Sequence, residues 1–360
     1  MKQTTALKFS WLNFLTKKRY DALLAKFGSL DDALGHIDQE VLAQLGCREE
    51  TQFEVLNRLE EFDPDAYAAE LAKRSITFIT LEDEAYPRSL LQIPDPPVFL
   101  YAQGSLQIVD QPCIGCVGTR EMSPYGKRVV EQFVPAFVRA GLTTVSGLAL
   151  GIDAAVAEET MRAGAATVAV LGHGMGQIYP RANAALAKRI VESGGLLLSE
   201  FPLDQQPGKF TFPARNRIIA ALSVGTVVFE AGRESGALIT AELALEYGRD
   251  VFAVPGQIFD EHFAGCHYLI GAGQAKLVAS PDDVLREIGV VAPSGERTQA
   301  FRSEDAEEQR VYDALTSMPQ SVSDLTERAV LETAVINAKL TMLELSGAAK
   351  NIGNGMWVQT

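Results

Sequence analysis

Between residues 112 and 290, short apolar runs alternate with segments whose hydrophobic residues recur at helical spacing. Near-continuous runs of Val, Leu and Ala are typical of strands buried on both faces, and the helical segments between them indicate crossover connections. The pattern predicts strands at 112–117, Leu142–Ser146, Thr167–Leu171, Leu196–Ser199, Thr226–Phe229, Val251–Val254 and Lys276–Val278. We therefore expect an α/β fold, in which a Rossmann-like, doubly wound and mostly parallel sheet occupies residues 75–290.

The residues before this sheet show two other patterns. Residues 1–72 contain short helical periods interrupted at Gly28 and Gly46, which is typical of a small SAM-like or helix-hairpin-helix-like domain. Residues 75–107 begin with a strand-like run and continue into a proline-rich passage. We expect this second segment to form an extended strap rather than a helix.

The C-terminal pattern predicts a third domain. Residues 291–306 form a polar linker, and residues 307–360 predict three helices followed by a hairpin with an Asn354-Gly355 turn. Three helices and a β-hairpin make a winged helix. Its third helix carries Lys339 as its one basic residue, so we expect this domain to contact protein rather than to read DNA.

Charge is distributed unevenly along the chain. The net charge is −14, but residues 111–220 carry 11 basic and 8 acidic residues and are net +3. Such a segment would attract a polyanion while the rest of the chain repels it. Residues 1–110 are net −7, which favours packing or partner contacts over DNA contacts for the helical domain. No apolar run is long enough to span a membrane and the N-terminus lacks a signal-peptide pattern, so we expect a cytoplasmic protein.

The turn after the strand at 112–117 has the features of an anion site. Gly118-Thr119-Arg120 joins this strand to an amphipathic helix, so the turn exposes backbone N–H groups near the positive end of that helix. Arg120 would add a bidentate contact to a phosphate. The alternative is a purely structural turn with a solvated arginine, because strand–glycine–helix turns occur in most doubly wound folds.

The turns after the later strands add polar and basic residues. Because the carboxyl ends of parallel strands lie at one edge, we expect four arginines to converge there beside aromatic side chains. Guanidinium groups for phosphates and rings for unstacked bases are the combination that binds single-stranded nucleic acid. The expected DNA-contact residues are Gly118, Thr119, Arg120, Ser146, Gly147, Arg181, Phe212, Arg215, Asn216 and Arg217. Two alternatives remain open: Phe212 could belong to the core, and Arg215 could pair internally with Glu200 or Glu230.

The same turns hold no arrangement typical of catalysis or metal binding. Cys113 and Cys116 have metal-site spacing, but positions i and i+3 of a strand point to opposite faces, and no second pair completes a zinc site. His173 has no nucleophile motif beside it, and Asp153 is expected to tie its own loop. The G-x-G-x-x-G fingerprint of dinucleotide sites is absent after the first parallel strand. We expect no catalytic residue, no metal and no cofactor.

A series of motifs carries a family resemblance. In order along the chain they are VGTREMSPYG, VSGLALGID, TVAVLGHG, YPRAN, LLLSEFP, FPARNRIIAALS, SGALITAELAL and GRDVFAVPG. The chain closely resembles the DprA/Smf family of DNA-processing proteins over residues 75–290, and the flanking segments also fit that family. Ala157 and Ala237 stand where the family often has His and usually has Ser, which leaves any role of those side chains open.

The resemblance implies a non-enzymatic, homodimeric protein that binds single-stranded DNA. Members of the family protect incoming DNA during natural transformation and load RecA recombinase onto it. The resemblance also implies that Arg120 and Arg181 contact DNA. Apolar residues in the net-acidic segment 250–290 are then expected to form the homodimer or RecA interface, with the strongest candidates being Ile258, Leu269 and Ile270.

An enzyme is the alternative function. The fold also resembles that of nucleoside-monophosphate phosphoribohydrolases, whose signature is PGGxGTxxE. The corresponding place in this chain has the sequence EAGRESGALITAE, which lacks the double glycine and the Gly-Thr core of that signature. Fold alone does not establish such an activity.

Overall fold

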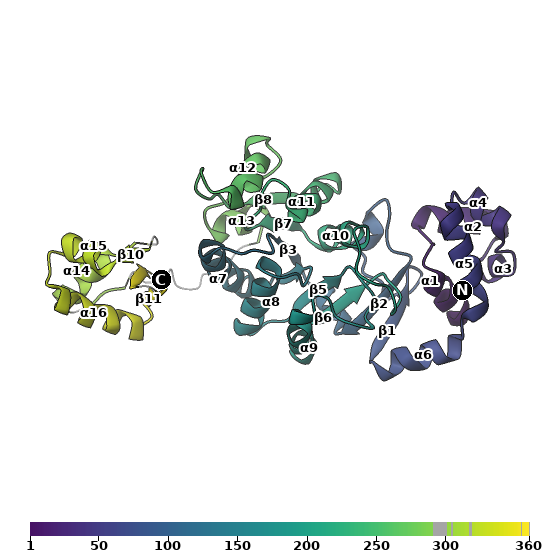
Figure 1. Ribbon diagram of the computed structural model, residues 1–360, viewed down its shortest axis with the longest axis horizontal. Coiled ribbons are helices and arrows are strands. Elements are labelled where there is room, and N and C mark those ends of the chain that lie inside the picture. The colour runs from purple at the N-terminus through teal and green to yellow at the C-terminus, as the bar shows by residue number, and fades with distance from the viewer. Residues whose placement is uncertain (291–300, 304, 317–318, 354, 360) are drawn as a thin grey trace. The chain divides into compact units, whose positions relative to one another are not determined.

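The computed structural model describes residues 1–290, 301–303, 305–316, 319–353 and 355–359. The chain divides into two compact units, Met1–Pro293 and Ser294–Thr360 (Figure 1). The larger unit holds the sheet and the helices that precede it in the sequence, and the smaller unit holds the C-terminal helices. Most of the expected linker at 291–306 lies outside the described residues.

A nine-stranded sheet forms the centre of the larger unit, with the strand order β1-β2-β6-β5-β4-β3-β7-β8-β9. Its strands are β1 (Ile76–Thr80), β2 (Phe99–Gly104), β3 (Cys113–Val117), β4 (Thr143–Ser146), β5 (Thr167–Leu171), β6 (Leu196–Ser199), β7 (Gly225–Val228), β8 (Asp250–Ala253) and β9 (Lys276–Leu277). In this order, each pair of neighbours from β6 through β5, β4, β3, β7 and β8 to β9 is parallel. The pairs β1 with β2 and β2 with β6 are antiparallel. The mostly parallel sheet expected from the apolar runs is confirmed.

The segment 75–107, expected as an extended strap, contributes two strands to this sheet. β2 pairs with β1 and extends the sheet on its other side, where Tyr101 pairs with Ser199 of β6. The first four residues of β2, Phe99 to Ala102, are buried, because a strand added to a covered sheet is packed on both faces. The prolines lie between β1 and β2, where no backbone N–H is needed for the ladder.

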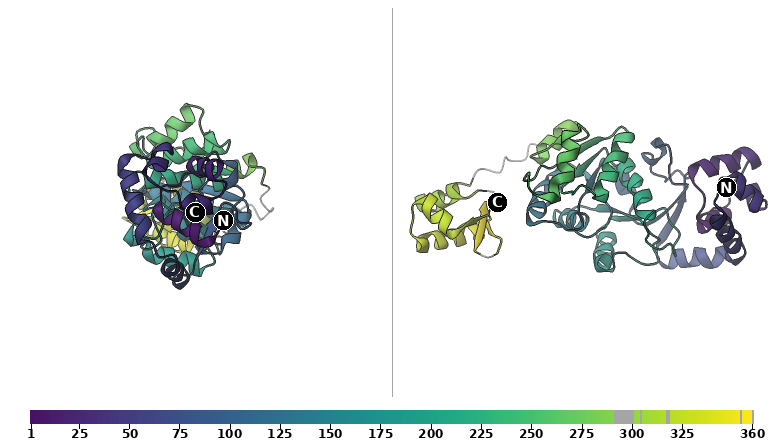
Figure 2. Two further views of the ribbon diagram at one scale, coloured as in Figure 1. Left: turned by 90° about the vertical axis from the view of Figure 1, so that its right-hand side faces the viewer. Right: turned by 45° about the horizontal axis from the view of Figure 1, so that its top comes forward.

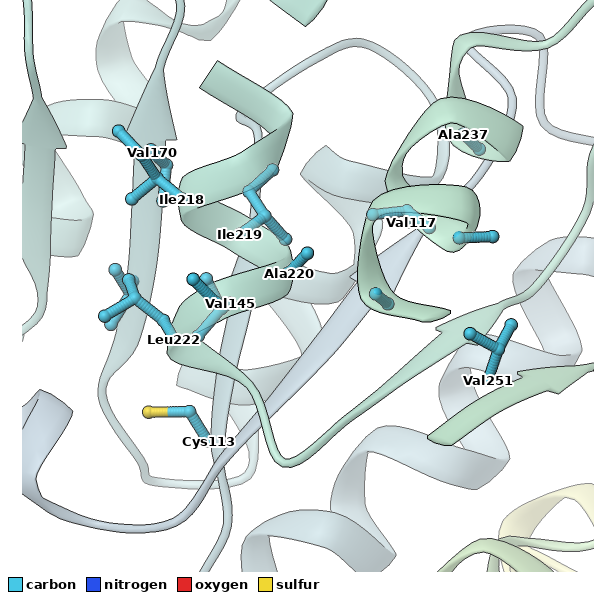
Figure 3. Packing of buried hydrophobic residues seen from close by; sticks show 14 of the residues in the cluster. Cys113, Val117, Val145, Val170, Ile218, Ile219, Ala220, Leu222, Ala237 and Val251 are labelled. Atoms are coloured by element: carbon cyan, nitrogen blue, oxygen red, sulfur yellow. The ribbon is translucent and has the colours of Figure 1, made fainter. Parts of the chain in front are cut away.

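Helices cover both faces of the sheet (Figure 1). They are α7 (Pro124–Arg139), α8 (Ile152–Arg162), α9 (Ala184–Glu192), α10 (Thr211–Leu222), α11 (Gly236–Glu246), α12 (Ala264–Gly271) and α13 (Pro281–Glu287). One cluster of buried side chains joins α7, α8 and α13 to one face. A second cluster joins α10, α11 and α12 to the other face, with Ile218 and Leu222 of α10 near Val145 and Val170 (Figure 3). The sheet is therefore doubly wound, as expected.

The two cysteines with metal-site spacing follow the geometry expected of a strand. Cys113 belongs to the buried cluster under α10, whereas Cys116 belongs to the cluster under α7 on the opposite face. Both thiols are free. Burial raises the pKa of Cys113 to about 12, so this thiol stays protonated and behaves as a small apolar group.

Six helices precede the sheet within the larger unit. They are α1 (Gln3–Leu12), α2 (Lys17–Phe27), α3 (Leu30–Leu34), α4 (Gln39–Gln44), α5 (Glu49–Glu61) and α6 (Pro64–Lys73). Their buried residues form one cluster that also takes in Val98 and Phe99, at the start of β2. The helices lie beside β1 and β2, drawn from purple to blue in Figures 1 and 2. The helical segment is thus packed against the edge of the sheet where β1 and β2 lie.

The smaller unit is a winged helix, as expected. It consists of α14 (Ala306–Ala314), β10 (Gln320–Ser321), α15 (Val322–Ala329), α16 (Thr333–Leu345), β11 (Ala349–Asn351) and β12 (Met356–Gln359), with the strand order β10-β12-β11. Lys339 of α16 forms ion pairs with Asp305 at 2.5 Å and with Glu307 at 3.9 Å. The one basic residue of the third helix is therefore engaged within its own unit.

Candidate nucleic-acid interface

The direction of the strand order changes at β3. β4, β5 and β6 follow on one side of β3, and β7, β8 and β9 lie on the other side. The turns after β3 and β7 diverge and leave a crevice at the carboxyl ends of the strands, where open α/β sheets bind ligands. A cavity of about 450 Å³ lies there, and its lining includes Gly118, Arg120, Phe212, Arg215, Asn216 and Ser235.

The positive end of α7 is occupied by a carboxylate of the protein itself. Glu230, which follows β7, is fully buried, and its carboxylate accepts hydrogen bonds from the backbone N–H of Ser123 at 3.1 Å and from its hydroxyl at 3.0 Å. A Cβ on Gly126 would lie 1.9 Å from this carboxylate, so glycine is required there. The expectation that this helix end attracts phosphate is wrong, because Glu230 already compensates the helix dipole.

The turn Gly118-Thr119-Arg120 is held on both sides by the protein. Thr119 donates its backbone N–H to the Glu230 carbonyl at 2.7 Å and accepts the N–H of Ile152, at the start of α8, at 3.1 Å. A Cβ on Gly118 would lie 2.6 Å from the Ile152 side chain, so this glycine allows close packing against α8. Among the residues that the structure describes, the N–H groups of Gly118 and Arg120 have no acceptor. The turn thus keeps two backbone donors.

The turn after β4 is closed by Asp153, as expected of a residue that ties its own loop. Its carboxylate accepts the backbone N–H groups of Gly147 at 2.9 Å and Ala149 at 3.3 Å. The hydroxyl of Ser146 is buried and faces the Asp153 carbonyl at 3.5 Å. Burial raises the pKa of Asp153. Neither Ser146 nor Gly147 therefore offers the free donor that the sequence led us to expect.

Arg120 and Arg181 are both exposed, and Arg120 lies close to an aromatic ring. The guanidinium carbon of Arg120 is 5.3 Å from the ring centre of Phe212, and that ring is 6.0 Å from the ring of Tyr179. Arg181 follows Tyr179 by two positions in the same turn. In the described part of the chain, no carboxylate lies within ion-pair distance of either arginine. Phe212 is half-buried and lines the cavity, so it belongs to the surface of the site rather than to the core.

Arg215, by contrast, lies inside the protein. Only 5% of it is exposed, and its Nη1 donates to the backbone carbonyls of Gly147, at 2.6 Å, and Val170. Burial lowers its pKa to about 10, although the nearby Asp153 opposes this effect. Arg215 therefore joins the ends of β4 and β5, and the expectation that it stands with Arg120 at the surface is wrong.

Arg217 and Asn216 are also engaged within the protein. The Arg217 side chain is 15% exposed and pairs with Glu200 at 2.5 Å and Asp95 at 3.2 Å. The internal partner foreseen for Arg215 thus belongs to Arg217. Asn216 is buried and donates its amide to the Gly236 carbonyl at 3.3 Å. Successive helical positions turn by about 100°, so three adjacent polar residues of α10 cannot share one exposed face.

Lys209 is a basic residue that sequence reasoning missed. It is exposed in the loop before α10, next to Phe210, which is 88% exposed. The tetrapeptide Lys209-Phe210-Thr211-Phe212 places one basic side chain and two aromatic rings within four residues, and this pattern is visible in the sequence. We call the surface formed by these exposed basic and aromatic side chains the rim, which consists of Arg120, Tyr179, Arg181, Lys209, Phe210 and Phe212.

The residues expected at a homodimer or RecA interface have different environments. Ile258 is 79% exposed, and the neighbouring Phe259 is 92% exposed. Leu269 of α12 is fully buried, and its neighbour Ile270 is partly buried against the same cluster. Leu269 is therefore a core residue, because its position on α12 faces the sheet, and the expectation that it is a surface contact is wrong.

Within the described residues, the crevice shows no arrangement for nucleophilic catalysis. Glu230 lies between Ser123 and His262, whose Nδ1 is 3.2 Å from its carboxylate. A catalytic triad instead needs the imidazole between the hydroxyl and the carboxylate. No group of three or more His, Cys, Asp or Glu in this part of the chain could hold a metal ion. No described helix is long and apolar enough to cross a membrane.

Fold and site together define a class: doubly wound α/β proteins with a ligand crevice at the topological switch point, here joined to a winged helix. Sequence comparison then gives the family. Residues 77–289 match the family model described as DNA recombination-mediator protein A, and residues 295–354 match the DprA winged helix domain. The chain belongs to the DprA/Smf family of DNA-processing proteins.

Individual relatives agree with this assignment. The chain is 43% identical over 257 residues to DNA processing protein DprA of Streptococcus pneumoniae, covering 70% of this chain and 89% of that relative. It is 39% identical over 255 residues to protein Smf of Escherichia coli, covering 70% and 67% of the two chains. The family resemblance drawn from the motifs is therefore confirmed.

The likeness to the family extends to solved structures. The X-ray structure of DprA from Streptococcus pneumoniae superposes with a TM-score of 0.67 at 38% identity, covering 80% of this chain and 98% of that one. DNA processing protein A from Helicobacter pylori gives a TM-score of 0.53 at 30% identity, covering 59% and 95%. The second structure is described for its single-stranded DNA binding mode.

Proposed function

We propose that this chain binds single-stranded DNA at the rim. The observation that carries the proposal is the free guanidinium of Arg120, 5.3 Å from the half-exposed ring of Phe212. A guanidinium for the phosphate and a ring for an unstacked base are the two contacts that a single strand requires. The positive balance of residues 111–220 and the single-stranded DNA binding of the Helicobacter pylori relative support the proposal.

Duplex DNA is the poorer ligand for this surface. In a duplex the bases are stacked and paired, so the rings of the rim have no base face to contact. Reading a major groove requires a helix with exposed basic side chains. The one basic side chain of α16, Lys339, is instead paired with Asp305 and Glu307. We therefore infer a preference for single strands.

A salt series with oligo-dT and a matched duplex tests this proposal. The rim has three exposed basic side chains, Arg120, Arg181 and Lys209, which would displace counterions from the DNA. Each would contribute about −0.7 to the slope of the logarithm of the binding constant against the logarithm of the salt concentration. We expect a slope of about −2 for oligo-dT in fluorescence anisotropy, with weaker binding to the duplex. Tighter binding to the duplex at every salt concentration would contradict the proposal.

We further infer that the protein acts without chemical turnover. The carboxylate of Glu230, at the place of the hydrolase signature, is buried and engaged by Ser123. A general acid or base must instead reach the substrate. No free adenine is therefore expected from AMP. Glu242 is the last residue of the segment EAGRESGALITAE. Release of adenine, together with loss of that release in Glu242→Gln, would favour the phosphoribohydrolase alternative.

The partners are inferred from the motifs of the chain. In line with its family, we propose that the chain acts in the cytoplasm as a homodimer and passes bound strands to RecA recombinase during natural transformation. The adjacent exposed side chains Ile258 and Phe259 support a protein interface on this part of the larger unit. Light scattering tests the dimer. RecA filament formation on oligo-dT, with and without this protein, tests the transfer.

A further inference from the structure

Two loops that carry the rim are bonded to each other. The turn after β5 leads to Tyr179 and Arg181, and the turn after β6 leads to Lys209 and Phe212. Their backbones join through two hydrogen bonds, in which Gly174 and Gly176 donate to the carbonyls of Gln205 and Leu203 at 2.9 and 3.0 Å, respectively. The two loops therefore form one paired element beneath the rim.

The helices that precede the sheet support this paired element through polar contacts. Arg58 of α5 contacts Asp204 with Nη2 3.1 Å from Oδ2, and its guanidinium carbon lies 4.2 Å from the ring centre of Trp11 in α1. Asn13, at the end of α1, donates its amide to the side chain of Gln205 at 2.7 Å. Two side chains, Arg58 from α5 and Asn13 from the end of α1, thus fix two consecutive residues of the loop after β6.

A second set of contacts lies deeper. The Tyr67 hydroxyl of α6 accepts the backbone N–H of Leu203 at 3.0 Å, and the hydroxyls of Tyr67 and Tyr101 are 3.2 Å apart. Arg74, at the end of α6, donates to the Gly176 carbonyl at 3.2 Å. Leu203 and Met175 are buried with residues of α1, α6 and β2. Both loops are therefore held by the helices that precede the sheet and by β2.

We propose that the helical segment 1–73 is a positioning element for single-stranded DNA, and that Arg58 is a positioning residue acting through Asp204. This inference rests on the proposed function of the rim. The pair of Arg58 with Asp204 is partly solvent-exposed, and such pairs contribute little to global stability. The pair acts on the loop instead, because it fixes the backbone from Leu203 toward Lys209 and Phe212. The Lys209 side chain and the Phe212 ring are then pre-organised to bind single-stranded DNA.

The variant Asp204→Asn separates positioning from simple electrostatics. Removing a negative charge near a site for a polyanion should tighten binding if charge alone matters. Positioning predicts the opposite, with oligo-dT binding weakened on the order of three- to tenfold. The salt slope should stay at the wild-type value, because no phosphate contact is lost, whereas Arg120→Ala should flatten it by about 0.7. Arg58→Ala should behave like Asp204→Asn.

A charge exchange provides the rescue. The double variant Arg58→Asp with Asp204→Arg keeps the net charge and can reform the pair, so it should recover much of the lost affinity. Arg189→Ala is the matched control, since Arg189 in the last turn of α9 forms a solvent-exposed pair with Glu158 of α8 at 3.0 Å. It should bind like wild type. Melting temperatures of all the variants should stay close to that of wild type.

The outcomes separate this inference from the function on which it rests. If wild type binds oligo-dT and Asp204→Asn binds equally well or more tightly, the positioning role is wrong and the rim proposal stands. If wild type binds no oligonucleotide at any salt concentration, both are wrong. Hydrogen exchange without DNA gives a second measure, since residues 201–210 should exchange faster in Arg58→Ala. Unchanged exchange there would also count against the inference.

Discussion

Arg120 and Arg215 both line the crevice, but their guanidinium groups differ in what they are free to contact. Arg120 is exposed with no carboxylate partner in the described chain, whereas Arg215 donates to two buried carbonyls. A free guanidinium in water can exchange its hydration for a phosphate, and one that satisfies buried acceptors cannot do so without leaving them unpaired. Substitution of Arg120 should therefore weaken DNA binding without changing stability, whereas substitution of Arg215 should lower the stability of the protein.

Arg120→Ala and Arg181→Ala are expected to weaken oligo-dT binding at low salt. Each substitution removes one phosphate contact, so the salt slope should flatten by about 0.7 per variant. Anisotropy across a salt series measures both effects, and thermal unfolding should show an unchanged midpoint. Wild-type affinity and slope in both variants would rule out the rim as the DNA site.

Arg215→Ala is expected to destabilise the protein by about 3 kcal/mol, because it leaves the carbonyls of Gly147 and Val170 without a donor in a buried place. Urea unfolding measures the change, with Arg120→Ala as the control of matched chemistry. A stable Arg215→Ala protein that has lost DNA binding would mean that this side chain does contact the strand.

At the scale of elements, Glu230 links β7 to the start of α7. Glu230→Gln keeps the shape but removes the charge that the helix end and the Ser123 donors favour, so we expect a loss of about 2 kcal/mol in urea unfolding. Gly126→Ala should cost a comparable amount, since its Cβ would overlap the Glu230 carboxylate. Glu234→Gln, an exposed neighbour, is the control. Equal stability of all three variants would contradict the assigned role of Glu230.

Elements marked by a strong hydrophobic pattern were predictable from the sequence. The strands β5 and β6 occur at the predicted residues, because continuous apolar runs have few alternatives in a covered parallel sheet. The pairing of β2 with β6 was not predictable, since the strand pattern of β2 does not name its partner. The environment of Arg215 was missed for a similar reason: its acceptors are backbone carbonyls from distant strands, which leave no trace in the sequence.

At the scale of the whole molecule, the exposed pair Ile258 and Phe259 bears on assembly. We expect Phe259→Asp to convert a homodimer into folded monomers at micromolar concentration by light scattering, because this side chain is 92% exposed in one chain. Leu269→Asp should instead lower the melting temperature sharply, since it places a charge in the core. A wild-type protein that is already monomeric would exclude this interface.

The antiparallel pairing of β2 with β6 affects the order in which the chain acquires structure during synthesis. Tyr101 of β2 cannot pair with Ser199 of β6 until β6 has been synthesised. At the usual rates of translation, the segment between them takes roughly 5–20 s to emerge from the ribosome. During that time β2 presents an apolar, unpaired edge, which is the kind of surface that aggregates. The six preceding helices are complete by then and already cover Val98 and Phe99. The segment that supports the rim in the finished protein would thus also shield the nascent sheet before β6 exists.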